Sequence, residues 1–150
     1  MSGQETGMQA LLDLLKRADG LFFLPANAGD LAGLLRRARE SLGMEPPDDY
    51  MALLRRTDGV VADGLTLYGS RAHSFDNAGM PELVEANLDR RDYRPDASGM
   101  LLLGERDDDF IAFKPGDGLY WRVDRLSGEL DASATNLASM IASLLRYSVG

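Results

Sequence analysis

The sequence has 150 residues, of which 45% are hydrophobic and 27% are charged, and these values are typical of one globular domain. It contains no cysteine, which excludes disulfides, thiolate metal sites and a cysteine nucleophile. The net charge of −8 argues against direct binding to nucleic acid. No apolar run approaches the roughly 18 residues of a membrane helix, and no secretory signal is recognisable, so we expect a cytoplasmic protein.

The first part of the chain is predicted to be mostly helical. Apolar residues repeat at helical spacing from Met8 onwards, and this first helix is expected to end near Gly20. A second helix is predicted over residues 31–42, with Asp30 as its N-cap and Gly43 as its terminator. A third, short helix is predicted to follow, with an apolar face made of Tyr50, Leu53 and Leu54.

Extended segments are predicted around and after these helices. The apolar stretch 21–25 ends in a proline and could either pair as an edge strand or fill part of the core. Residues 60–69 are predicted to form a hairpin, with its turn at Asp63-Gly64.

The middle of the chain carries weaker patterns. Residues 70–81 are predicted to be an irregular loop, and a helix is predicted to open at Pro81 and to run through Leu88. The charged segment 89–99 is expected to be an exposed connection.

A meander of three strands is predicted over Met100–Glu105, Asp109–Lys114 and Leu119–Asp124. In the third strand, alternation places Tyr120 on the polar face, together with Arg122 and Asp124, opposite the apolar face. Thr135 is predicted to cap a final amphipathic helix. The whole pattern predicts a single α+β domain over residues 1–150, with helices packed on an antiparallel sheet of four to six strands.

The sequence contains no recognisable catalytic constellation. His73 is the only histidine, and although serines flank it, no nucleophile-elbow pattern does, so a loop histidine without a catalytic role is favoured. One histidine without cysteine cannot supply the usual zinc ligands. The run Asp107–Asp109 lacks the alternate spacing of a calcium loop, and Lys114–Gly118 leads into a strand rather than the helix of a phosphate-binding loop.

The acidic residues are unevenly distributed. Residues 57–150 carry a net charge of −7, against −1 for residues 1–56. An acidic surface favours cationic partners and accelerates their encounter, although it can equally be a solvated rim that only confers solubility. We predict a docking surface for a basic protein, with contacts from Glu105, Asp107, Asp108, Asp109, Asp117 and Tyr120.

Several short motifs occur in a suggestive order from about Gly43 to the C-terminus. In chain order they are Pro47-Asp48-Asp49-Tyr50, Leu53-Leu54, Thr57-Asp58-Gly59, Leu65-Thr66-Leu67-Tyr68-Gly69, Asn87, Leu101-Leu102-Leu103-Gly104 and Asp109-Phe110. Together with the closing amphipathic helix, this order resembles the SMI1/KNR4 (SUKH) superfamily, and within it the bacterial YrhA-like group.

The resemblance implies an α+β scaffold without catalytic residues or a cofactor. Many bacterial members are immunity proteins, which bind and neutralise the toxin domain of a polymorphic or contact-dependent toxin system. The expected function is therefore a non-enzymatic, protein-binding one. Two alternatives stay open: a regulatory or scaffold protein of the same superfamily, and a small hydrolase that uses two buried carboxylates with shifted pKa in a deep cleft.

Overall fold

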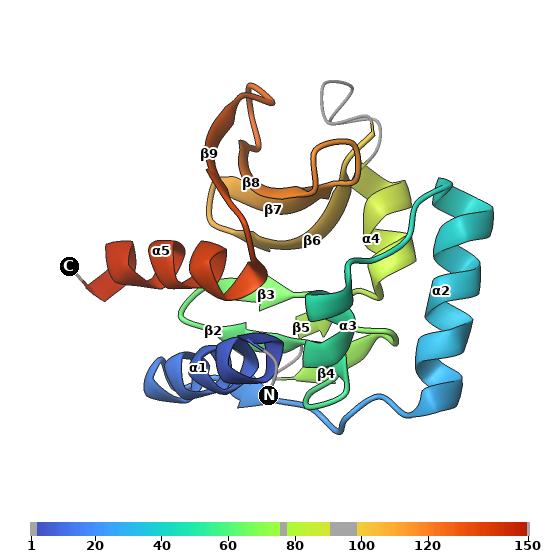
Figure 1. Ribbon diagram of the computed structural model, residues 1–150, viewed down its shortest axis with the longest axis horizontal. Helices are drawn as coiled ribbons and strands as arrows, with labels where there is room; N and C mark the ends of the chain where they lie inside the picture. Colours follow the sequence, from blue (N-terminus) through green and yellow to red (C-terminus); the bar gives the residue numbers. More distant parts are fainter. Residues whose placement is uncertain (1–2, 76–77, 91–98, 150) are drawn as a thin grey trace.

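The computed structural model describes residues 3–75, 78–90 and 99–149, and within them the chain forms five helices and nine strands (Figure 1). Seven strands build one antiparallel sheet, and two more form a separate small sheet. The predicted α+β class and antiparallel pairing are confirmed. The main sheet is larger than the predicted four to six strands, because a short strand joins each of its edges.

The main sheet has the strand order β1-β2-β3-β6-β7-β8-β9. Both the predicted hairpin and the predicted three-stranded meander are present, and the apolar stretch after the first helix pairs as an edge strand. The strands are β1 (Leu21–Phe22), β2 (Val60–Ala62), β3 (Leu65–Leu67), β6 (Leu101–Arg106), β7 (Asp109–Lys114), β8 (Leu119–Asp124) and β9 (Leu130–Ala134).

Strand β9 closes the other edge of the sheet and was not predicted. Its five residues are exposed or half-buried, so they lack the apolar alternation that indicates a strand. Their pairing with β8 comes from backbone hydrogen bonds and chain proximity, which side-chain patterns do not reveal.

The prediction of an irregular loop over residues 70–81 is wrong in part. Strands β4 (His73–Phe75) and β5 (Ala78–Met80) pair there as a small antiparallel sheet. Together with β2 and β3, these strands occupy much of residues 60–80, so the mostly helical character of the first half holds only as far as Leu54. Of the expected connection 89–99, residues 91–98 lie outside the described residues.

The helices are α1 (Gly3–Arg17), α2 (Ala28–Leu42), α3 (Asp48–Leu54), α4 (Leu83–Arg90) and α5 (Leu137–Val149). Gly43 ends α2 in a left-handed conformation, as predicted. The N-cap of α2 is Asn27 rather than Asp30, because the two residues form a capping box in which each side chain accepts from the other's backbone N–H.

The cap of α5 also lies one residue from its predicted position. Asn136, rather than Thr135, accepts a hydrogen bond from the backbone N–H of Ser139. Asparagine and threonine are both good N-caps, so that sequence alone does not choose between neighbours.

The helices pack in two groups around the sheet. Helix α1 contacts α3 and α5, whereas α2 lies beside α4, which in turn contacts β6 (Figure 1). One continuous apolar core joins these elements, and it includes the fully buried side chains of Leu15, Leu34, Tyr50, Leu53, Leu54, Leu65, Leu67, Leu83 and Leu101.

Asn87 attaches α4 to the sheet through a buried amide. Its Nδ2 donates to the carbonyl oxygens of Leu83 and Leu102, and its Oδ1 accepts from the N–H of Leu102, at 2.8–2.9 Å. Both backbone groups of Leu102 are therefore bonded to one side chain. This contact satisfies polar groups that would otherwise be buried without a partner.

Gly104 lies where β6 changes register against β7, and it allows β3 to approach β6 closely. A Cβ atom at this position would stand 2.3 Å from the carbonyl oxygen of Thr66 and 2.9 Å from Cδ2 of Leu67. The first of these neighbours is backbone, which cannot move without disturbing the ladder between β3 and β6. Only glycine fits here.

We therefore predict that Gly104→Ala lowers the free energy of unfolding by about 2–3 kcal/mol, the usual cost of overpacking a core. Gly116→Ala is the matched control, since no atom lies within 4 Å of its added Cβ. Urea unfolding should show a change within about 0.5 kcal/mol for the control. Equal effects of the two substitutions would show that close packing of β3 on β6 is not what requires a glycine.

Candidate functional site

Three turns of the main sheet meet at the same end of their strands. The turn between β2 and β3 lies beside that between β6 and β7, because Leu65 pairs with Arg106. Asp109 pairs with Asp124, which brings the turn between β8 and β9 to the same end. Residues that are distant in the sequence are thus gathered at one end of the molecule.

This end of the sheet carries an excess of negative charge. Its seven carboxylates, which we call the acidic end, belong to Asp63, Asp107, Asp108, Asp109, Asp124, Glu129 and Asp131. Three arginines lie among them. Arg106 pairs with Asp63 and Asp107, Arg122 lies 3.9 Å from Asp109, and the backbone N–H of Arg125 donates to the carbonyl of Asp108.

Three of these carboxylates are packed closely together. Oxygen atoms of Asp109, Asp124 and Asp131 lie within 4.8 Å of one another. Partial burial raises the pKa of Asp109, and the charges of Asp131 and Asp124 raise it further, whereas Arg122 lowers it. This spacing suits a hard cation such as Ca²⁺, but one oxygen from each carboxylate supplies only three of the six to eight oxygens that calcium takes.

The acidic end also exposes apolar side chains. Leu126, in the turn between β8 and β9, is 90% exposed, and Leu130 at the start of β9 is 42% exposed. Leu126 is held in place because the carboxylate of Asp124 accepts from the N–H groups of Leu126 and Ser127, each at 2.8 Å. An ordered turn therefore presents a leucine to solvent among carboxylates.

The structure brings together four of the six residues that were predicted to contact a partner. Asp107 and Asp108 are exposed in the turn between β6 and β7, and Asp109 begins β7. Glu105 lies next to them but is already engaged, because it accepts from the hydroxyl of Tyr68 at 2.6 Å and forms ion pairs with two arginines, Arg90 and Arg125.

The other two predicted residues, Asp117 and Tyr120, lie at the opposite end of β7 and β8. Asp117 is exposed in the turn, where it accepts from the indole N–H of Trp121 at 3.1 Å. Tyr120 is only 3% exposed, so its assignment to a polar face was wrong. The alternation predicted that face, but α3 and α5 cover this side chain and bury it.

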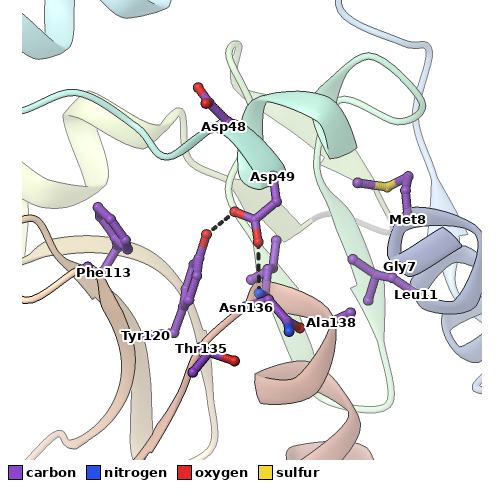
Figure 2. Close-up of a pocket in the computed structure, with 12 residues that line it drawn as sticks. Gly7, Met8, Leu11, Asp48, Asp49, Phe113, Tyr120, Thr135, Asn136 and Ala138 are labelled. Atoms are coloured by element: carbon purple, nitrogen blue, oxygen red, sulfur yellow. Dashed lines mark hydrogen bonds between the residues drawn. The ribbon is translucent and has the colours of Figure 1, made fainter. Parts of the chain in front are cut away.

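A cavity of about 440 Å³ opens beside Tyr120 (Figure 2). It lies between the first turns of α3 and α5, helix α1 and the end of the β7–β8 hairpin. Its walls combine apolar, aromatic and acidic side chains, and the lining residues are Gly7, Met8, Leu11, Asp48, Asp49, Phe113, Gly118, Tyr120, Thr135, Asn136, Leu137 and Ala138.

Asp49 is the half-buried acid of this cavity. The hydroxyl of Tyr120 donates to its Oδ1, and the backbone N–H of Leu137 donates to its Oδ2 at 2.9 Å (Figure 2). Desolvation raises the pKa of Asp49 above its ordinary value, and this effect exceeds the opposing effect of the backbone hydrogen bonds. The carboxylate therefore ties α3 to β8 and α5.

The cavity supplies one of the two acids that the hydrolase alternative requires. Asp48 is exposed, and its carboxylate points away from that of Asp49 (Figure 2). Both oxygens of Asp49 already accept hydrogen bonds. The two neighbouring acids consequently do not face each other across a cleft, as acid–base hydrolysis of a glycoside requires.

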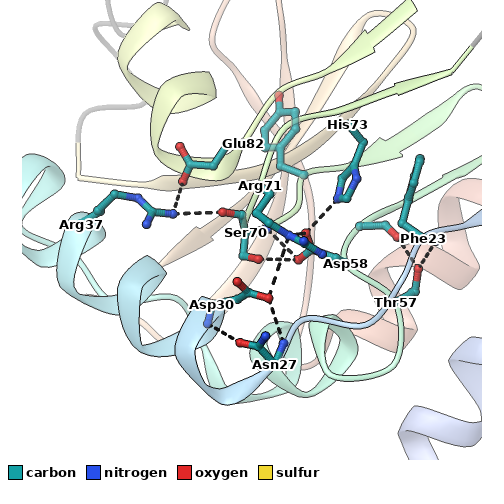
Figure 3. A network of polar contacts seen from close by, with 12 residues as sticks. Phe23, Asn27, Asp30, Arg37, Thr57, Asp58, Ser70, Arg71, His73 and Glu82 are labelled. Atoms are coloured by element: carbon teal, nitrogen blue, oxygen red, sulfur yellow. Dashed lines mark hydrogen bonds and ion pairs between the residues drawn. The ribbon is translucent and has the colours of Figure 1, made fainter.

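A second polar cluster surrounds the fully buried carboxylate of Asp58 (Figure 3). Its Oδ1 accepts from the backbone N–H and the hydroxyl of Ser70 at 2.8 and 2.7 Å. Its Oδ2 lies 2.8 Å from Nε2 of His73 and 3.5 Å from Nε of Arg71. The ring of His73 also stacks on Phe23.

This cluster contains a serine, a histidine and an aspartate, but their order differs from that of a catalytic triad. In a triad the histidine stands between the acid and the hydroxyl. Here the carboxylate stands in the middle, and Ser70 donates its proton to Asp58 rather than to His73. The geometry joins the loop after β3 to the turn before β2, and it does not activate the hydroxyl.

Sequence reasoning missed the cavity. Asp49 was named only within the motif Pro47-Asp48-Asp49-Tyr50 at the start of the third helix, and its contact with Tyr120 spans 71 positions. Asn136 was overlooked in favour of Thr135. The only signal for this site was the juxtaposition of two acids with the start of a short helix, which is also the ordinary composition of a first helical turn.

Comparison with protein-family models and with curated proteins found no match. Among the described residues, no helix is both long and apolar enough to cross a membrane.

The raised pKa of Asp49 predicts a specific dependence of stability on pH. The folded state holds the Asp49 proton more tightly than the unfolded chain does, so ionisation of this group costs stability as the pH rises above about 4. Asp49→Asn removes that cost. The stability of the variant relative to the natural chain should therefore increase between pH 3 and pH 7, as measured by urea unfolding.

Asp89→Asn, which removes an exposed carboxylate on α4, is the control for the loss of one negative charge. A relative stability of Asp49→Asn that stays constant, or that falls with rising pH, would contradict the burial effect at Asp49.

The close approach of three carboxylates at the acidic end gives a second prediction for stability. Asp109 and Asp124 are directly opposite each other on β7 and β8, and Asp131 adds a third negative charge. Asp131→Asn should raise the free energy of unfolding by about 0.5 kcal/mol at low salt and Tm by about 1–2 °C. Scanning calorimetry should show this gain shrinking in 1 M salt; a lower Tm would contradict the repulsion.

Proposed function

We propose that this chain is a non-enzymatic protein-binding module, an immunity protein that binds and neutralises a basic bacterial toxin domain. The observation that carries the proposal is the acidic end, where seven carboxylates and an exposed leucine, Leu126, lie at the same end of the main sheet. The motif order that resembles the SMI1/KNR4 superfamily, and its YrhA-like group, supports the same function. The proposed location is the cytoplasm, where such a protein meets its toxin.

The charge at the acidic end suits a cationic macromolecule. Seven acids against three arginines leave an excess of four negative charges over three neighbouring turns. A clustered field of this kind accelerates the encounter with an oppositely charged partner and orients it before contact. Because nuclease toxins are often basic, an acidic inhibitor can occupy the surface that their nucleic acid substrate would otherwise take.

Leu126 adds what charge alone does not provide. Interfaces take most of their affinity from a few side chains that become fully desolvated, whereas charges at the rim mainly set the association rate. Leu126 is exposed, and the Asp124 carboxylate orders the turn that carries it. We therefore assign to Leu126 the role of apolar anchor, with the surrounding carboxylates as its polar rim.

Reversal of charge at the acidic end tests this proposal. The triple variant Asp108→Lys, Glu129→Lys and Asp131→Lys changes exposed side chains, so we expect Tm to stay within a few degrees. Its association with the cognate toxin domain that the proposal requires should slow at least about tenfold at low salt, and depend less on salt. Stopped-flow or surface plasmon resonance measures both quantities.

The matched control is Glu40→Lys, Glu85→Lys and Asp89→Lys, which makes the same change of net charge on exposed sites of α2 and α4. It should slow association by less than about threefold, because none of its three charges belongs to the turns that form the proposed docking surface. Equal slowing by both triple variants would show that only net charge matters. Unchanged association of the first variant would remove the acidic end from the interface.

A further inference from the structure

The acid of the cavity beside Tyr120, Asp49, lacks the cationic partner that other buried carboxylates of the molecule have. Three other buried or partly buried carboxylates pair with a cation. Asp58 has Arg71, Glu82 has Arg37 at 3.2 Å, and Glu105 has both Arg90 and Arg125. Ion pairing of this kind is the usual way in which proteins offset the desolvation of a buried charge.

Asp49 has no such partner. No lysine, arginine or histidine among the described residues forms an ion pair with its carboxylate; the groups that stabilise it are the hydroxyl of Tyr120 and backbone N–H groups, that of Leu137 first among them. Asp48, one residue earlier on α3, adds a second negative charge at the rim. The cavity is thus bordered by negative charge that nothing in the described chain neutralises.

The walls of the cavity suit an organic cation better than a bare ion. Phe113 and Tyr120 form a tilted aromatic pair, with ring centroids 5.1 Å apart. Met8, Leu11 and Leu137 line the cavity as well. Aromatic faces attract ammonium and guanidinium groups, whereas apolar walls favour the hydrocarbon that carries such a group. Its volume, about 440 Å³, falls within the range of small-molecule pockets.

We propose that this cavity binds an organic cation, an ammonium or guanidinium group on an apolar stem, with Asp49 as counter-ion and Phe113 and Tyr120 as aromatic walls. The group belongs either to a free small amine or to a lysine or arginine side chain of another protein. The site lies at the opposite end of β7 and β8 from the acidic end, so it is separate from the docking surface proposed above.

The electrostatics of Asp49 agree with this assignment. Desolvation raises its pKa, and a neighbouring cation would favour the ionised form and lower the pKa again. The titratable groups that face Asp49 are Asp48 on its own helix and Tyr120 on β8. Affinity for the cation should consequently fall when the pH is lowered far enough to protonate Asp49.

Titration followed by ¹H–¹⁵N NMR at pH 7 tests the proposal, with benzylamine as the cationic probe and benzyl alcohol as its neutral counterpart. Benzylamine should shift the backbone signals of Asp49, Tyr120, Asn136 and Ala138 in a saturable manner. It should bind at least about tenfold more tightly than benzyl alcohol, because only the amine carries a charge that Asp49 can pair with.

Variants of the cavity locate the charge and the aromatic wall. Asp49→Asn keeps the shape of the side chain and should weaken benzylamine binding about tenfold or more, whereas Asp89→Asn, on exposed α4, should change it less than twofold. Phe113→Leu leaves every hydrogen bond of Asp49 intact and should weaken binding about threefold or more. The NMR spectrum of each variant shows directly whether it is folded.

The source of the cation is distinguished by a second probe, the capped tripeptide acetyl-Gly-Arg-Gly-amide. Tighter binding of this peptide than of benzylamine would assign the cavity to a side chain of another protein, and tighter binding of benzylamine would assign it to a free amine. The proposal is overturned if neither probe shifts the cavity signals at 10 mM, if benzyl alcohol binds as tightly as benzylamine, or if Asp49→Asn binds benzylamine unchanged. None of these results affects the acidic end.

Discussion

The buried carboxylate of Asp58 holds together the part of the chain where helices give way to strands. It accepts two hydrogen bonds from Ser70 and faces His73 and Arg71, so the loop after β3 is attached to the turn before β2. An uncompensated charge at this depth would cost several kcal/mol. The positions of these segments therefore follow from the need to surround one aspartate with donors.

The close packing around Asp58 depends on the same turn. Gly69 lies against the backbone of Asp58, and a Cβ there would stand 2.5 Å from the carbonyl oxygen. Arg37 of α2 donates to the carbonyl of Ser70 and to Glu82, which in turn accepts from the N–H groups at the start of α4 (Figure 3). The cluster thus links α2 and α4 to the loop after β3, and so holds these two helices against the main sheet.

The two surfaces for which we propose a partner both carry carboxylates whose negative charge is only partly balanced. The acidic end and the cavity of Asp49 lie at opposite ends of β7 and β8, and both carry negative charge that the described chain does not fully balance. At Asp58, in contrast, the balance is complete and the polar groups are structural. This difference in charge balance distinguishes the two proposed binding surfaces from the internal Asp58 cluster more clearly than the number of acids does.

Much of the fold could be predicted from the sequence because its long elements have strong periods. The apolar spacing of α2 and α5 identifies helices locally, and the short apolar runs of β6 and β7, bounded by turn residues, identify strands. Strand β9 and the pair β4–β5 could not be predicted, since backbone pairing with distant segments defines them. The contact between Asp49 and Tyr120 also joins distant segments and could not be predicted. Alternation did not show that helices cover Tyr120 on the face expected to be polar.

The predicted acids Asp107, Asp108 and Asp109 could be found from sequence because they are consecutive, and turns expose such runs. Their union with Asp63, Asp124 and Asp131 depends on strand order, which the sequence does not state. Asp117 was grouped with them because it is close in the chain. In a meander, successive turns lie at opposite ends of the strands, so the turn that contains Asp117 is far from the one that contains Asp107 and Asp108.

Hydrogen exchange of a complex with the proposed toxin partner tests the central claim most directly. Binding through the acidic end should slow amide exchange in residues 63–64, 107–109 and 124–131, while the amides of α2 and α4 exchange as they do in the free chain. Slowed exchange confined to α2 and α4, with the three turns unchanged, would contradict the claim that the carboxylates around Leu126 form the docking surface.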